Sequence, residues 1–155
     1  MKKYEFTGEV KRIKLIGTEV VLRRIRAVTA FGVVEAGDIG GWIEKEENLS
    51  HDGSAWVHSS AWVYGDARVY GDAEVYSANH IFSIGPVGSR DGHTTFYRCK
   101  NKKIEVRCGC FNGRIEEFIE KVAETHGKNK HASVYRAAAE IAKLQIFGVT
   151  TWDIK

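Results

Sequence analysis

The sequence has few of the residues that mark secreted or membrane proteins. Of its 155 residues three are cysteine and one is proline, and no apolar run approaches the roughly 18 residues of a membrane-spanning helix. Three cysteines are too few, and odd in number, for the disulfide framework of a small secreted domain. The stretch MKKYEFTGEV has no apolar segment behind its two lysines, so we expect no signal peptide and a cytoplasmic protein.

The net charge of +3 is small, but the charges are unevenly distributed. Lys and Arg outnumber Asp and Glu by 8 to 3 in residues 1–34 and by 13 to 8 in residues 77–155, whereas residues 35–76 hold 2 basic and 9 acidic side chains. Basic flanks can attract the phosphates of a nucleotide or nucleic acid, and they are also typical of a solvated face of mixed charge. The acidic middle argues against a protein that wraps DNA.

Residues 56–85 repeat with a period of six. Successive hexads read WVHSSA, WVYGDA, RVYGDA, EVYSAN and HIFSIG, each with a branched aliphatic residue in second place. The Gly-Asp pairs suit corners that need unusual backbone dihedral angles. Two short extended steps and a turn predict one side of a triangular solenoid, in which residue i stacks under residue i+18. The predicted stacks are Val57 under Val75, Val63 under Ile81, and His58 under Tyr76.

This pattern resembles the hexapeptide repeat of left-handed parallel β-helices, a stem found in many acyltransferases. The resemblance covers residues 55–85, and five hexads make fewer than two coils. The turn before them, Gly-Asp-Ile-Gly-Gly-Trp-Ile at residues 37–43, resembles the lead-in of uncharacterised bacterial and phage β-helix proteins. The aromatic residues beside the repeats, Trp56 and Trp62 among them, indicate either a subunit contact or packing against the N-terminal strands.

The hexads end at Pro86, where we place a domain boundary between residues 1–85 and 86–155. Residues 94–100 and 103–111 then predict a β-hairpin that turns at Asn101-Lys102. In that register Cys99 lies opposite Ile104 and Phe96 opposite Arg107. One face would be apolar, and its members would be Tyr97, Cys99, Ile104, Val106, Cys108 and Cys110.

Two helices are predicted after the hairpin. Apolar residues at 115, 118, 119 and 122 have helical spacing, with Asn112 as the expected N-cap and Gly127 as the end. A second helix is expected from about residue 131 to 147, ending at Gly148, and residues 149–154 predict a last strand. The expected fold is therefore mixed β and α: strands, a short left-handed parallel β-helix stem, and a small ββαα unit.

The C-terminal unit also offers groups that bind anions. Phe96, Arg98 and Arg107 share the other face of the predicted hairpin, which would suit a base and phosphates and is equally typical of a solvated sheet. The free N–H groups of the first helix could hold a phosphate. The predicted ligand-binding residues are Ser89, Arg90, Phe96, Arg98, Arg107, Asn112 and Arg114.

Metal and cysteine chemistry are not expected. Cys99, Cys108 and Cys110, with His93 or His126, could supply four soft ligands, but their spacing fits no common zinc site. The hairpin register assigns all three thiols to a core face, where a nucleophile lacks exposure and a base.

Residues 94–144 resemble a C-terminal module of small phage and prophage proteins, on the motifs Thr94-Thr95-Phe96, Cys108-Gly109-Cys110-Phe111 and Thr125-His126-Gly127. Phage proteins of this plan are similar to oligomeric sponges that sequester the nucleotide signals of bacterial immunity. The resemblance implies a cytoplasmic, non-enzymatic homo-oligomer that acts against host defence by binding a small anionic, nucleotide-like ligand, without a cofactor.

Two alternatives stay open. The repeat's resemblance to acyltransferases implies a catalytic histidine on or near the coils, for which His51, His58 and His80 are candidates, although the stem is short for a pantetheine arm. A structural or protein-binding module is the second alternative.

Overall fold

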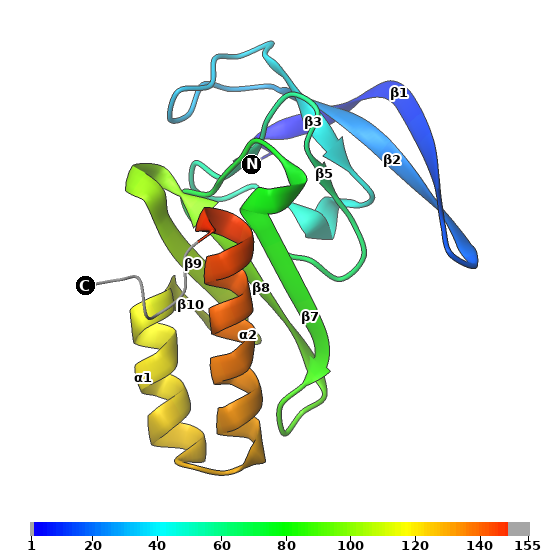
Figure 1. The fold of residues 1–155 in the computed structure, drawn as a ribbon. Helices are drawn as coiled ribbons and strands as arrows, with labels where there is room; N and C mark the ends of the chain where they lie inside the picture. Colours follow the sequence, from blue (N-terminus) through cyan, green and yellow to red (C-terminus); the bar gives the residue numbers. More distant parts are fainter. Residues whose placement is uncertain (1, 149–155) are drawn as a thin grey trace. The chain divides into compact units, whose positions relative to one another are not determined.

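The computed structural model describes residues 2–148, and these form two compact units that divide between Ala78 and Asn79 (Figure 1). The strand predicted at residues 149–154 lies outside the described residues. Neither helix in the described part of the chain is both long and apolar enough to cross a bilayer.

The N-terminal unit is built on a long antiparallel hairpin (Figure 1). It consists of β1 (Tyr4–Leu15) and β2 (Thr18–Ala27), and β3 (Ile39–Ile43) pairs antiparallel with β2. The two-residue strand β5 (Trp62–Val63) pairs parallel with β3 and completes a four-stranded sheet. The remaining short strands, β4 (Trp56–Val57) and β6 (Glu74–Val75), form a separate parallel pair.

The glycine pair at 40–41 allows the backbone of β3 to approach the hexads closely. A Cβ at Gly40 would lie 2.6 Å from the Trp56 ring, and one at Gly41 would lie 2.6 Å from the carbonyl oxygen of Ala61. Both glycines are buried, and the Trp42 N–H beside them donates to Ala61 at 2.9 Å. The turn motif noted in the sequence therefore serves packing within this unit.

The predicted left-handed β-helix stem is wrong. Among the described residues the hexads before residue 80 form at most two-residue strands, in a mixed sheet and in the β4–β6 pair, the last hexad joins an antiparallel sheet, and no parallel β-helix is present. Val63 and Ile81, which were expected to stack, belong to different sheets, since Val63 pairs with Ile43 and Ile81 with Tyr97. Fewer than two coils leave most strand edges without a neighbouring coil, and pairing with longer strands satisfies those backbone groups instead.

The 18-residue spacing is present at one place in the N-terminal unit. Val57 pairs parallel with Val75, and the rings of His58 and Tyr76 stack with centroids 4.0 Å apart. The hexad pattern therefore predicted which residues are neighbours there, although it did not predict the architecture.

The C-terminal unit is an antiparallel sheet with two helices on one face (Figure 1). Its strand order is β10-β9-β8-β7. The strands are β7 (Ile81–Val87), β8 (Gly92–Cys99), β9 (Lys103–Cys108) and β10 (Phe111–Arg114). The helices are α1 (Ile115–His126) and α2 (Lys130–Phe147). Buried side chains of both helices pack against Phe96, Ile104 and Val106 of the sheet.

The sheet has two more strands than the predicted ββαα unit. β7 comes from the last hexad and includes Pro86, where we expected a domain boundary. Ile81–Ile84 pair with Thr94–Tyr97 of β8, so these residues belong to the C-terminal sheet, and the division at Ala78 lies seven residues before the expected one at 85. β10 was not expected, and it places Asn112 in a strand, so Asn112 as the N-cap of α1 is wrong.

The ends of both helices otherwise follow the predicted signals. Gly127 is the C-cap of α1, and Gly148 in the left-handed region is the C-cap of α2, as predicted. The Asn129 side chain caps α2 by accepting the N–H of Ala132 at 3.0 Å.

The register between β8 and β9 differs by one residue from the predicted one. Phe96 lies opposite Val106, whereas we expected it opposite Arg107. The cause is the connection, because three residues, Lys100–Lys102, form a short 3-10 turn where we expected a two-residue turn.

A slip of one residue moves the side chains of one strand to the opposite face relative to its partner strand. Phe96 therefore faces the helices, and Tyr97 and Cys99 lie on the other face with Glu105 and Arg107. The predicted apolar face, which combined Tyr97 and Cys99 with Ile104 and Val106, is wrong.

Candidate functional site

The C-terminal unit holds a pocket of about 390 Å³. It lies between the loop that joins β7 to β8, the turn that joins β9 to β10, and the C-terminal half of α1, with one side chain from α2. All of its lining residues fall between Val87 and Tyr135.

Tyr135 of α2 forms part of the wall of the pocket. Its ring packs edge-on against Phe118 with centroids 5.5 Å apart, and its hydroxyl lies close above Gly88, where a Cβ would collide with it. Burial, with a smaller effect from Cys108, raises the pKa of Tyr135 to about 12, so the phenol keeps its proton at neutral pH.

A short chain of hydrogen bonds connects this phenol to the sheet. Thr94 Oγ1 donates to Cys108 Sγ at 3.2 Å, and the Cys108 thiol donates to the Tyr135 hydroxyl at 3.8 Å. The pocket thus has polar groups from Cys108 at the end of β9 and from Tyr135, beside an apolar wall that includes Phe111 and Phe118.

The lining of the pocket carries positive charge. Arg90 comes from the β7–β8 loop and Lys121 from α1, both exposed, and the imidazoles of His93 and His126 line the same space. None of the lining residues that the structure describes has a carboxylate. An anion in this pocket would meet two permanent cations and no like charge, which is the arrangement that attracts and holds anions.

The structure brings together two of the seven predicted ligand residues, because Ser89 and Arg90 both line the pocket. Phe96 has no exposed surface and packs against Phe82 and Phe118, so it serves the core and cannot stack on a ligand. Arg98 follows two residues later on the same face of β8 and does not line the pocket.

The other three predicted residues lie on the face of the sheet away from the helices. The pairing places Arg107 opposite Asn112 and Glu105 opposite Arg114. Asn112 Nδ2 donates to the Tyr97 hydroxyl at 2.5 Å. These residues share a face because of the register, and the pocket is on the opposite one.

The residues around the N-terminus of α1 also do not favour the predicted phosphate site there. Glu116 and Glu117 occupy the first turn of this helix, and their carboxylates already complement the helix dipole. A phosphate there would meet two like charges.

Sequence reasoning missed Lys121, His126 and the aromatic wall. A signal was available on α1, since residues 118, 121, 122 and 125 all line the pocket with the spacing of one helix face. Because residues 118 and 122 also fit apolar core positions, the spacing alone did not indicate a pocket.

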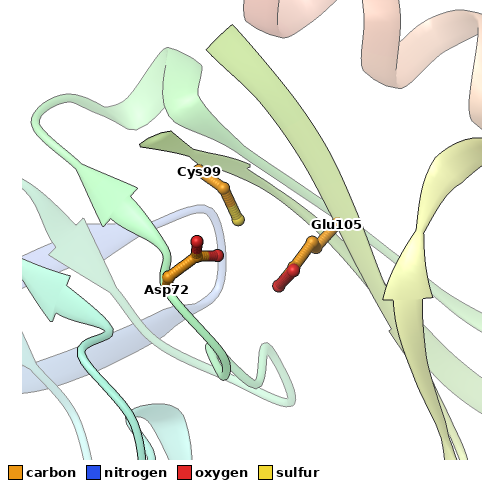
Figure 2. A group of neighbouring side chains, drawn as sticks. All are labelled: Asp72, Cys99 and Glu105. Atoms are coloured by element: carbon orange, nitrogen blue, oxygen red, sulfur yellow. The ribbon is translucent and has the colours of Figure 1, made fainter. Parts of the chain in front are cut away.

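The three thiols lie in different surroundings. Cys99 is buried on the face away from the helices, Cys108 is half-buried in the pocket, and Cys110 is exposed on the β9–β10 turn. Figure 2 shows Cys99 and Glu105 on the neighbouring strands β8 and β9, and it also labels Asp72 of the N-terminal unit. From this sheet, Cys99 and Glu105 supply one thiol and one carboxylate, whereas a tetrahedral zinc site needs four ligands.

The histidines considered for acyl transfer are held neutral by their surroundings. Burial lowers the pKa of His51, His58 and His80 below the ordinary value of 6.5. His51 is engaged in structure, because its Nδ1 accepts the backbone N–H of Lys3 at 3.0 Å and its ring stacks on Tyr4. His58 stacks on Tyr76 and is half-buried.

Comparison with known proteins gives one partial similarity. No family model matches the chain. A stretch of 62 residues is 37% identical to a protein of Escherichia coli (strain K12) described as the uncharacterized acetyltransferase YdcK. The match covers 37% of the chain and 19% of the relative, so the chain spans about a fifth of the relative's length.

Proposed function

We propose that the C-terminal pocket binds a small anionic ligand that carries an aromatic ring, and that nucleotides are the ligand class. The observation that supports this most directly is the lining: Arg90 and Lys121 stand beside aromatic rings, and no carboxylate is present among the described lining residues.

The cationic side of the pocket fits a phosphate. Arg90 offers a planar guanidinium that can donate two parallel hydrogen bonds to phosphate oxygens, and Lys121 offers a second permanent charge from the facing helix. Ser89 and Thr125 add hydroxyl donors on the same two elements. His93 and His126 could add further donors.

The apolar side fits a ring. Phe111 and Phe118 lie with ring centroids 5.7 Å apart, and the Tyr135 ring packs on Phe118. Pockets for small molecules in proteins span about 300–1,000 Å³. A volume of about 390 Å³ is near the lower end of that range, which favours a mononucleotide over a larger dinucleotide.

Calorimetric titration tests this proposal. The full chain should bind adenosine monophosphate more tightly than uncharged adenosine. Arg90→Ala and Lys121→Ala should each weaken the nucleotide about tenfold or more, since a hydrogen bond to a charged group contributes about 1.5–3 kcal/mol. Lys128→Ala removes a nearby exposed charge that does not line the pocket and should leave affinity unchanged. Equal affinity for nucleotide and nucleoside would contradict the proposal.

The wider role belongs to the same proposal. A cytoplasmic homo-oligomer that sequesters a nucleotide signal without converting it, of the phage type inferred from the sequence, requires binding with no turnover. Native mass spectrometry of freshly purified protein would measure both the assembly and any retained nucleotide.

Acyl transfer is a second candidate because of the similarity to a protein described as an acetyltransferase. A neutral imidazole is the form that can act as a general base, and burial keeps His58 and His80 in that form. Turnover of acetyl-coenzyme A with an amine or sugar acceptor, lost in His58→Ala or His80→Ala, would support this candidate. Absence of turnover with a broad acceptor panel would count against it.

A further inference from the structure

Two of the three cysteines line the cationic pocket. Cys108 and Cys110 both line it, and they flank Gly109 in the turn between β9 and β10. The nucleotide contacts proposed above use neither thiol, since the charges come from the β7–β8 loop and α1. A pair of nucleophilic side chains in a pocket lined by Arg90 and Lys121 is therefore a feature that binding alone does not use.

The three cysteines differ in how easily a reagent in solution can reach them. Cys99 is 2% exposed and lies on the other face of the sheet. Cys108 is half-buried, and its sulfur is hydrogen-bonded with Thr94 and Tyr135. Cys110 is exposed and lines the pocket, so it is the most accessible of the three cysteines.

We infer that the pocket is a thiol–disulfide exchange site for anionic disulfides of low molecular weight, and that Cys110 is the attacking residue. Reactive cysteines lie in electropositive, partly exposed surroundings, which describes Cys110 and not Cys99. Arg90 and Lys121 raise the local concentration of an anionic reagent and lower that of a cationic one.

The exchange is a balanced two-electron step. The Cys110 thiolate attacks one sulfur of the disulfide, a new S–S bond forms, and the old S–S bond breaks. The second half of the reagent leaves as a thiolate and takes a proton from solvent. Cys110 is oxidised to a mixed disulfide, and the leaving half is reduced, so no further oxidant is required.

Intact-mass spectrometry with two reagents of opposite charge tests the inference. The full chain is treated with dithiobis(nitrobenzoate), an anionic aromatic disulfide, or with cystamine, a cationic one, and each rate is divided by the rate for the denatured chain. After this normalisation, the anionic reagent should modify the folded chain at least about tenfold faster than the cationic reagent does. Cys110→Ser should remove the fast reaction, whereas Cys99→Ser should retain it.

Arg90→Ala combined with Lys121→Ala should abolish the preference for the anionic reagent while Cys110 remains reactive. Equal normalised rates for both reagents, or a fast reaction that persists in Cys110→Ser, would overturn the inference. Titration of Cys110→Ser with adenosine monophosphate separates the two ideas. Retained nucleotide binding without selective exchange would refute this inference alone, and selective exchange without nucleotide binding would refute the proposed function alone.

Discussion

The Tyr135 hydroxyl lies so close above Gly88 that any side chain at position 88 would collide with it. Gly88 also has a φ of +80°, in the region that favours glycine. One position therefore satisfies two demands, the left-handed backbone of the β7–β8 loop and the close approach of a tyrosine from α2.

Gly88→Ala should destabilise the protein. Backbone strain of this kind costs about 1–3 kcal/mol, and the displaced Tyr135 ring would disturb the pocket wall as well. Chemical denaturation measures the free energy of unfolding. Gly92→Ala, at the first residue of β8 just after the loop, is the matched control, because no atom lies within 4 Å of its added Cβ and its φ is not in the left-handed region. A similar loss for both variants would contradict the explanation.

Phe96→Ala should cost about 3–5 kcal/mol of stability, the usual range for removing a buried phenylalanine. Phe96 has no exposed surface and packs in the core with Phe118. Phe96→Leu should lose much less, because it conserves most of the volume. A fully stable Phe96→Ala that binds no nucleotide would instead restore the role predicted from the sequence.

The free energy of unfolding should fall as the pH drops below 6.5. Burial lowers the pKa of His58 in the folded protein, although Glu74 opposes the shift. In the window between that lowered pKa and 6.5, the unfolded chain binds more protons, so acid favours unfolding. Thermal unfolding measured at several pH values should therefore give a shallower pH dependence for His58→Phe, which keeps a ring for stacking on Tyr76. An unchanged slope in this variant would exclude His58 as a source.

Asn129→Ala should destabilise α2 by about 1 kcal/mol, since it removes the side-chain oxygen that caps the Ala132 N–H. Asn129→Ser and Asn129→Asp can accept the same hydrogen bond and should stay close to the wild-type stability. Circular dichroism during thermal unfolding compares the three variants. Equal losses in all of them would show that the cap contributes nothing.

The helices were predictable because their signals are local. The apolar spacing in residues 115–122 indicates a helix, and the glycines at 127 and 148 mark where the two helices end. Each signal lies within a few residues of the feature that it predicts. The strands depend on partners far along the sequence, and there the prediction failed. The hexads predicted that Val57 and Val75 are neighbours, but not that residues 81–87 would leave the repeat and pair with β8.

The candidate site could be predicted only in part. Ser89 and Arg90 were found because glycine and polar residues around them indicate a loop, and loops reach the surface. Phe96 was misplaced because one extra residue in the connection at Lys100–Lys102 turns it toward the helices, on the opposite face of the sheet from Arg107. The rest of the lining comes from elements that meet only in the folded unit.

Because every lining residue lies between Val87 and Tyr135, the pocket is encoded by fewer than fifty consecutive codons. Recombination that exchanges the hexads or the long hairpin would change no residue of its lining. Chains with unrelated N-terminal halves could therefore inherit the same ligand chemistry, and a search for functional relatives should weigh this segment above the repeats.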